Sequence, residues 1–161
     1  MPQRFANVPM SDLIPETRAW NDGNGIDVKS WLSCIGSFVH AIAYGELFWP
    51  DFVEHDGCVF FAEFSETSYR GFMDQTKGNK KAVEAVMNHR HVLDLFPSNY
   101  ANVSKDQIVY LGRLLREMWE TKLRRDFPQR TFVVSFAEDS AEDLLGYEVT
   151  FFQDDVRVAK T

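Results

Sequence analysis

Apolar residues recur at intervals of three and four along residues 28–50, the spacing that places side chains on one face of an α-helix. Seven residues make up this stripe: Val28, Trp31, Leu32, Ile35, Phe38, Val39 and Ile42. Asp27 stands immediately before the stripe, where its carboxylate can accept hydrogen bonds from the first N–H groups of a helix. Pro50 lacks the N–H group that a continuing helix needs. The pattern therefore predicts one helix over residues 28–50 with a buried apolar face.

Two further helices are predicted, a short one over residues 65–78 and a longer one over about residues 79–96. In the longer helix, steps of 100° per residue place His89 on the apolar arc and His91 on the opposite side. Helical positions i and i+2 diverge by about 200°, so the two imidazoles are not expected to share a metal ion.

A long amphipathic helix follows from about residue 105. Ser104 and Gln107 have the spacing of a capping box, in which each side chain binds the backbone N–H of the other residue. The predicted inner face is apolar: Ile108, Leu111, Leu114, Leu115, Met118, Trp119 and Leu123. Pro128 is predicted to stop this helix.

Strands are predicted in two parts of the chain. Residues 58–64 are rich in aromatic and β-branched side chains and follow the turn signal Asp56-Gly57. Residues 131–137 and 147–153 have the same character and are joined by an acidic loop that ends in Gly146, which predicts an antiparallel hairpin.

The order of these elements favours an α+β fold, because helices and strands are segregated without regular βαβ alternation. We expect one domain over residues 1–161, a length that fits a single hydrophobic core. In this domain three to four helices pack on one face of a small antiparallel sheet of about three strands, and the chain ends in a β-hairpin. Residues 1–25 contain three prolines and a run of turn-forming residues, which predicts an irregular N-terminal arm.

The same composition leads us to expect a soluble, cytoplasmic protein. No stretch approaches the run of about 18 apolar residues that a membrane span needs, and the first residues lack the apolar segment of a signal peptide. Cys34 and Cys58 are too few for a disulfide framework, so both are expected to be small buried hydrophobic residues.

The net charge of the chain disfavours some classes of binding partner. The net charge of −7 and the isoelectric point of about 5.0 disfavour binding to nucleic acids and to anionic membranes, because both need basic surfaces. Residues 131–161 carry seven acidic and two basic residues, a net charge of −5. The partner expected is therefore a basic protein. The residues predicted to bind it are Glu138, Asp139, Glu142, Asp143, Asp154 and Asp155.

Two groups of polar residues could instead carry chemistry. The candidate catalytic residues are His40, Glu84 and His91, because imidazoles and carboxylates exchange protons near neutral pH and could converge if their helix faces met. The densest set of possible metal ligands lies between the first helix and the first strand: Asp51, Glu54, His55 and Asp56. Their spacing matches no established metal-site pattern, and loops are commonly polar, so no metal or other cofactor is predicted.

Two functions remain open from the sequence. The first is a small acidic protein-binding domain, of which an immunity- or antitoxin-type inhibitor of a basic toxin is one form, since complementary charge accelerates association. The alternative is a small hydrolase or metal-dependent enzyme that uses histidine and carboxylate residues. No phosphate-binding loop, nucleophile elbow or dinucleotide fingerprint is present, which favours the first.

Overall fold

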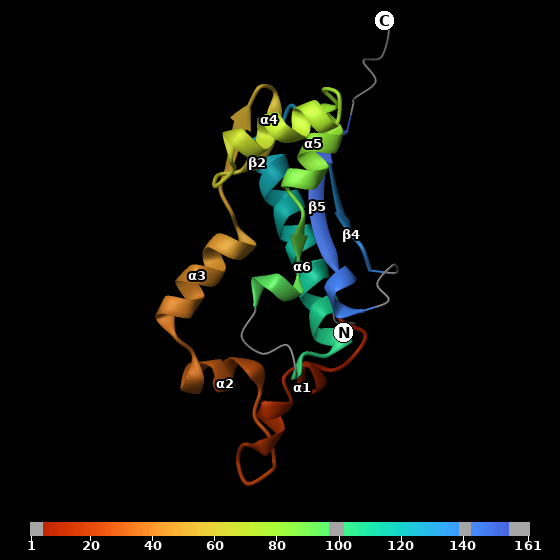
Figure 1. Cartoon of the computed structure of the whole chain (residues 1–161). Coiled ribbons are helices and arrows are strands. Elements are labelled where there is room, and N and C mark those ends of the chain that lie inside the picture. The colour runs from red at the N-terminus through yellow and green to blue at the C-terminus, as the bar shows by residue number, and fades with distance from the viewer. Residues whose placement is uncertain (1–4, 97–101, 139–142, 155–161) are drawn as a thin grey trace, which may run out of the picture.

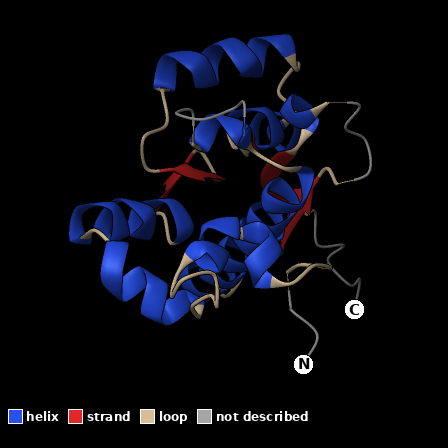
Figure 2. Ribbon diagram, turned by 90° about the horizontal axis from the view of Figure 1, so that it is seen from below, coloured by secondary structure: helices blue, strands red, loops and turns tan. Residues whose placement is uncertain are grey.

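Two small antiparallel sheets with helices packed on them form the molecule, which confirms the predicted α+β class (Figure 1). The computed structural model describes residues 5–96, 102–138 and 143–154. The first sheet is a two-stranded hairpin and the second has the strand order β3-β5-β4. The strands are β1 (Phe52–His55), β2 (Cys58–Phe61), β3 (Arg90–His91), β4 (Phe132–Phe136) and β5 (Glu148–Gln153). Figure 2 shows the short strands in red among the helices.

The β1–β2 hairpin corrects the prediction that residues 51–56 form a connecting loop. Asp56 and Gly57 both have positive φ angles, 51° and 77°, as a two-residue hairpin turn requires. The residues before this turn therefore pair with those after it, from His55 opposite Cys58 to Phe52 opposite Phe61. All four residues of β2 are buried, and β2 is shorter than the strand predicted over residues 58–64.

The predicted C-terminal hairpin is confirmed. Strand β4 pairs with β5 in the antiparallel register that runs from Phe132 opposite Gln153 to Phe136 opposite Val149. The other edge of β5 binds the two-residue strand β3, so β5 is the central strand of this sheet. Val149 and Phe151 point into the core and are fully buried.

Helix α6 (Lys105–Asp126) packs across the β4–β5 sheet and has the predicted capping box. Ser104 Oγ accepts the N–H of Gln107, and the Gln107 side chain accepts the N–H of Ser104 at 2.9 Å. Gly112 faces β4, where an added Cβ would overlap the ring of Phe136. The absence of a side chain at this position is therefore what lets α6 approach the sheet closely.

Short helices occur in the predicted irregular N-terminal arm. Helix α1 (Met10–Leu13) and the 3₁₀ helix η1 (Pro15–Ala19) lie within residues 1–25. Gln107 Nε2 donates to the Leu13 carbonyl at 2.7 Å and so ties α1 to α6.

The single helix predicted over residues 28–50 is two helices, α2 (Val28–Ile35) and α3 (Phe38–Phe48). Gly36 adopts an extended conformation with ψ of 149°, which ends α2, and Ser37 starts a new helix by accepting the N–H of His40. The predicted burial of the apolar stripe is wrong, because neither helix contains a buried residue. Both helices lie to one side of the molecule (Figure 1).

The helix predicted over residues 79–96 ends early. Helix α4 (Glu66–Gln75) is followed by α5 (Lys80–Met87), and the chain then enters β3 and the 3₁₀ helix η2 (Leu93–Leu95). Asn88 accounts for this ending, because its buried amide donates to the carbonyls of Val59 and Phe151 at 2.9 and 3.3 Å. These bonds hold Asn88 between the two sheets.

Candidate functional site

Three of the predicted partner-binding residues, Glu138, Asp143 and Asp154, are engaged within the fold. Glu138 forms a two-point ion pair with Arg113, which lowers the pKa of the Glu138 carboxyl. Asp143 caps the 3₁₀ helix η4 (Leu144–Gly146), and Asp154 pairs with Lys81 at 3.3 Å.

These carboxylates do not form one continuous patch. Glu138 and Asp143 flank one end of the β4–β5 hairpin, whereas Asp154 follows the opposite end of β5. The predicted partner-binding residues Asp139, Glu142 and Asp155 lie outside the described residues.

The structure does not bring the three catalytic candidates together. Glu84 is buried on α5 and accepts three hydrogen bonds, from the backbone N–H groups of Val59 and Gln153 and from the Gln153 amide. His40 is exposed on α3, while His91 lies in β3. Among the described residues, no cluster close enough to hold a metal ion includes His40 or Glu84.

The four weak metal candidates are likewise committed to other partners. Asp51 binds Lys122 at 3.4 Å, and Glu54 binds Arg130 at 2.7 Å. The hydroxyl of Tyr69 donates to Asp56, and this bond, together with Lys80, lowers the pKa of the Asp56 carboxyl. His55 packs against the rings of Phe64 and Tyr69. Turn geometry, ion pairing and packing account for these polar residues.

The relative placement of His89 and His91 corrects the sequence interpretation. Because the chain is extended here and not helical, the two side chains lie on the same side, with ring centroids 5.4 Å apart. The expectation that one points into the core and the other points away is wrong.

Large apolar side chains are exposed on α2 and α3. Five apolar side chains form what we call the α2–α3 face: Leu32, Ile35, Phe38, Val39 and Ile42. Phe38, Val39 and Ile42 expose 90%, 73% and 70% of their surfaces, and the other two expose 51% each. The sequence pattern correctly grouped these residues in one apolar stripe, but the prediction that the stripe is buried is wrong.

Helix α3 is attached to the body near its C-terminal end. The indole N–H of Trp119 donates to the Leu47 carbonyl at 3.1 Å, and Leu47 and Phe48 pack against the larger core cluster. The ring of Tyr44 lies 5.8 Å from that of Phe96. These contacts fix the C-terminal end of α3 and leave the side chains of the α2–α3 face exposed.

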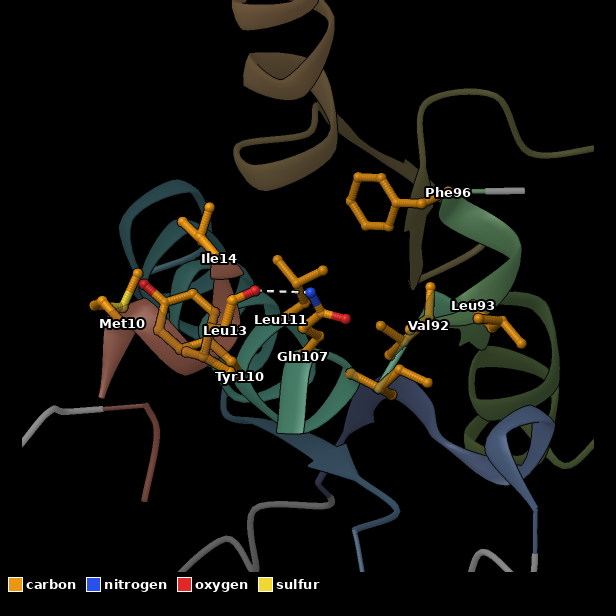
Figure 3. A pocket seen from close by; sticks show the side chains of 11 residues that line it. Met10, Leu13, Ile14, Val92, Leu93, Phe96, Gln107, Tyr110 and Leu111 are labelled. Atoms are coloured by element: carbon orange, nitrogen blue, oxygen red, sulfur yellow. Dashed lines mark hydrogen bonds between the residues drawn. The ribbon is translucent and has the colours of Figure 1, made fainter. Parts of the chain in front are cut away.

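An apolar cavity of about 310 Å³ lies beside this attachment (Figure 3). Figure 3 shows Met10 and Leu13 of α1 on one side, Phe96 on the other, and Gln107 of α6 between them. The lining is apolar except for Gln107 and the hydroxyl of Tyr110. Since Phe96 also contacts Tyr44, the rim of the cavity reaches α3.

Charge around the α2–α3 face is negative. Residues 10–51 contain six acidic and two basic residues, so this stretch carries −4 of the net charge of −7. Between Val28 and Phe48, only Lys29 and Glu46 carry a full charge at neutral pH. The apolar face is thus almost uncharged and is flanked by acidic residues.

No family model, curated protein or solved structure matches the chain. Within the described ranges, no helix is both long enough and apolar enough to cross a bilayer.

Proposed function

We propose that the protein is a protein-binding domain that docks through the α2–α3 face onto an apolar surface bordered by lysine and arginine residues. The observation that carries this proposal is the exposure of Phe38, Val39 and Ile42 on a helix that is attached to the body near its C-terminal end. A helix that is apolar around most of its circumference is normally buried. Residues 38–46 of helix α3 are all exposed, and its own chain covers it in part at Leu47 and Phe48, at the C-terminal end.

The size of the face supports an interface. Together the five residues expose roughly 600 Å², an area comparable to that of the apolar patches that mark interaction sites on monomers. Scattered single hydrophobic residues would need no such explanation, but these five are grouped on two consecutive helices.

Charge favours a basic partner over a second copy of the chain. Two copies joined through this face would bring together two stretches that each carry −4. Like charges at an interface oppose association, whereas a border of basic residues on the partner would accelerate it. The same acidic flanks oppose docking on an anionic membrane. The carboxylates of the C-terminal hairpin add to the long-range attraction, and a basic toxin domain neutralised by an immunity-type protein has the required charge.

Of the two cysteines expected to be buried, Cys58 is fully buried but Cys34 on α2 is exposed. Crosslinking from the Cys34 thiol tests this proposal. A benzophenone attached to Cys34 is expected to crosslink one basic protein from the source cell. Phe38→Ser/Ile42→Ser should abolish the crosslink and weaken the purified complex by at least tenfold. Leu145→Ser is the matched control, because Leu145 is an exposed apolar residue of η4.

Charge reversal in the segment that precedes α2 gives a second readout. Glu16→Lys/Asp22→Lys is expected to slow association at low salt and to leave the dissociation rate nearly unchanged. Three results would overturn the proposal: no crosslinked protein, the same crosslinks with the Ser double variant, or a wild-type homodimer that this variant dissociates. Binding to vesicles through the α2–α3 face in place of a protein would also overturn it.

A further inference from the structure

Three potential metal ligands converge beside the edge of the second sheet. His91 of β3 stands directly opposite Glu148 of β5 in the antiparallel register, so their side chains project from the same face. His89 lies two residues before His91 on an extended chain and shares that face. One nitrogen of each ring and one Glu148 oxygen all lie within 4.8 Å of one another.

Backbone carbonyls orient both imidazoles. His89 Nδ1 lies 2.6 Å from the carbonyl of Val86, and His91 Nδ1 lies 2.7 Å from the carbonyl of Leu145. A carbonyl oxygen only accepts hydrogen bonds, so these contacts assign the donor role to Nδ1, and the neutral form of each ring then has its lone pair on Nε2. Histidines that bind metals almost always donate their other nitrogen in this way.

The supporting carbonyls are themselves held in place. Val86 belongs to the last turn of α5, where carbonyls lack helical partners and are free to accept from side chains. Leu145 belongs to η4, which Asp143 fixes by accepting the N–H groups of Leu145 and Gly146 at 2.9 and 3.2 Å. Asp143 therefore helps to position His91 through the Leu145 carbonyl.

The neighbouring cation is directed away from the three ligands. Arg90 lies between the two histidines in sequence, and its guanidinium sits 4.5 Å from the ring centroid of Phe61 and pairs with Glu63. Successive side chains of an extended chain point to opposite faces, so Arg90 projects away from the side that His89 and His91 share. His89, His91 and Glu148 are each partly exposed, so an ion could reach them from solvent.

We propose that His89, His91 and Glu148 bind a divalent transition-metal ion. Two imidazoles and one carboxylate suit Zn²⁺, Fe²⁺, Co²⁺ or Ni²⁺, whereas Ca²⁺ and Mg²⁺ prefer ligand sets made only of oxygen. Ligand atoms around a four-coordinate zinc stand about 3.3 Å apart, so the three groups need to close by about 1.5 Å at most. Three protein ligands leave at least one position for water or another donor.

Binding would join a two-residue edge strand to the central strand of its sheet. Strand β3 leads directly into Val92 and Leu93, which line the cavity beside α6. An ion shared by β3 and β5 therefore links the second sheet to the cavity wall. This proposal does not depend on the protein-binding function, because none of the three ligands belongs to the α2–α3 face.

Metal titration of the full chain after treatment with a chelator tests the site. We expect one Zn²⁺ per chain, a micromolar or tighter dissociation constant, and a melting temperature that rises with Zn²⁺ but not with Ca²⁺ or Mg²⁺. Glu148→Gln, His89→Ala and His91→Ala should each weaken binding at least tenfold. His40→Ala is the matched control, because His40 is exposed on α3, and it should bind Zn²⁺ as the wild type does.

A spectroscopic measurement on the wild type covers the case in which a variant fails to fold. The chain has four histidines, and nitrogen-detected NMR of their side chains should show two with protonated Nδ1 before metal is added. The Nε2 resonances of those two alone should shift with Zn²⁺. Equal shifts in all four histidines, a loss of affinity in His40→Ala, equally tight Ca²⁺ binding, or no binding at 100 μM Zn²⁺ would each overturn the proposal.

Discussion

Glu84 Oε1 accepts the backbone N–H of Val59 at 2.7 Å, a bond that joins α5 to the first sheet. One helical turn later, Asn88 donates to the carbonyl of the same Val59. The two side chains also bind the second sheet, Glu84 through the N–H of Gln153 and Asn88 through the carbonyl of Phe151. A buried carboxylate and a buried amide thus connect two sheets that share no strand.

This arrangement predicts a large cost for a small change at Glu84. Glu84→Gln keeps the shape but replaces one acceptor oxygen with an NH₂ group that faces an N–H donor. We expect a loss of about 1–3 kcal/mol in the free energy of unfolding, measured by urea denaturation. Glu66→Gln is the control, because Glu66 is exposed and forms an ion pair with Arg70 on its own helix, and it should change stability by less than about 0.5 kcal/mol. Equal effects of the two substitutions would contradict this role for Glu84.

The close approach of Gly112 to Phe136 predicts that replacing this glycine by alanine destabilises the protein, whereas such a change in a helix usually stabilises it. Within an exposed helix such a change stabilises by about 0.5–1 kcal/mol. At Gly112 the new methyl group would overlap the Phe136 ring, so Gly112→Ala should destabilise by about 1–3 kcal/mol instead. Gly71→Ala on α4, where the added carbon meets nothing within 4 Å, should stabilise.

A double variant separates this packing effect from other causes. Phe136→Leu shortens the ring that a residue at position 112 would meet, so it should recover part of the loss caused by Gly112→Ala. Thermal unfolding of the two single variants and the double variant gives the coupling. Strict additivity would show that the Phe136 ring is not the obstacle.

Local signals explain which elements the sequence predicted correctly. The Ser104–Gln107 capping box defines the start of α6, and the loop ending in Gly146 separates two strands that pair as predicted. The capping box joins residues three apart, and the hairpin joins two strands that follow one another in the chain. Both elements therefore form with little dependence on distant parts of the sequence.

The features that could not be predicted from the sequence depend on contacts between distant parts of the chain. The spacing from Val28 to Ile42 shows that one face is apolar, but it does not identify what covers that face. The convergence of His89 with Glu148 depends on the end of α5 at Asn88, which is set by carbonyls of two distant strands. The i, i+2 spacing of the histidines would have indicated a shared face had the segment been predicted as a strand.

Stability should depend on pH through Glu138. Hydrogen bonds from Arg113 hold the pKa of the Glu138 carboxyl below its ordinary value of 4.5, and burial opposes this shift only in part. A carboxyl whose pKa is lower in the folded state stabilises fully above its unfolded pKa, and this contribution is lost as the pH falls through the folded pKa. The wild type should therefore lose stability more steeply than Glu138→Gln below about pH 4.5. Identical slopes of melting temperature against pH in this range would contradict the prediction.

Trp119 connects α6 to α3, so its removal should affect both the core and the position of the α2–α3 face. The side chain is 1% exposed, and its N–H binds the Leu47 carbonyl. Trp119→Ala is expected to cost about 3–5 kcal/mol in the free energy of unfolding, because a large buried ring is removed. Trp119→Phe keeps most of the apolar contact and loses the hydrogen bond, so its cost should be nearer about 1–2 kcal/mol.

Limited proteolysis distinguishes the two effects of these variants. If the bond to Leu47 holds α3 against the body, Trp119→Phe should increase cleavage within residues 37–49 while the rest of the chain keeps its wild-type resistance. Phe61→Leu, a substitution in the same core beside Trp119, is the control for general loosening, since Phe61 packs on the indole but forms no bond to α3. Equal cleavage patterns in Trp119→Phe and Phe61→Leu would show that α3 is held by core packing as a whole, and not by this bond.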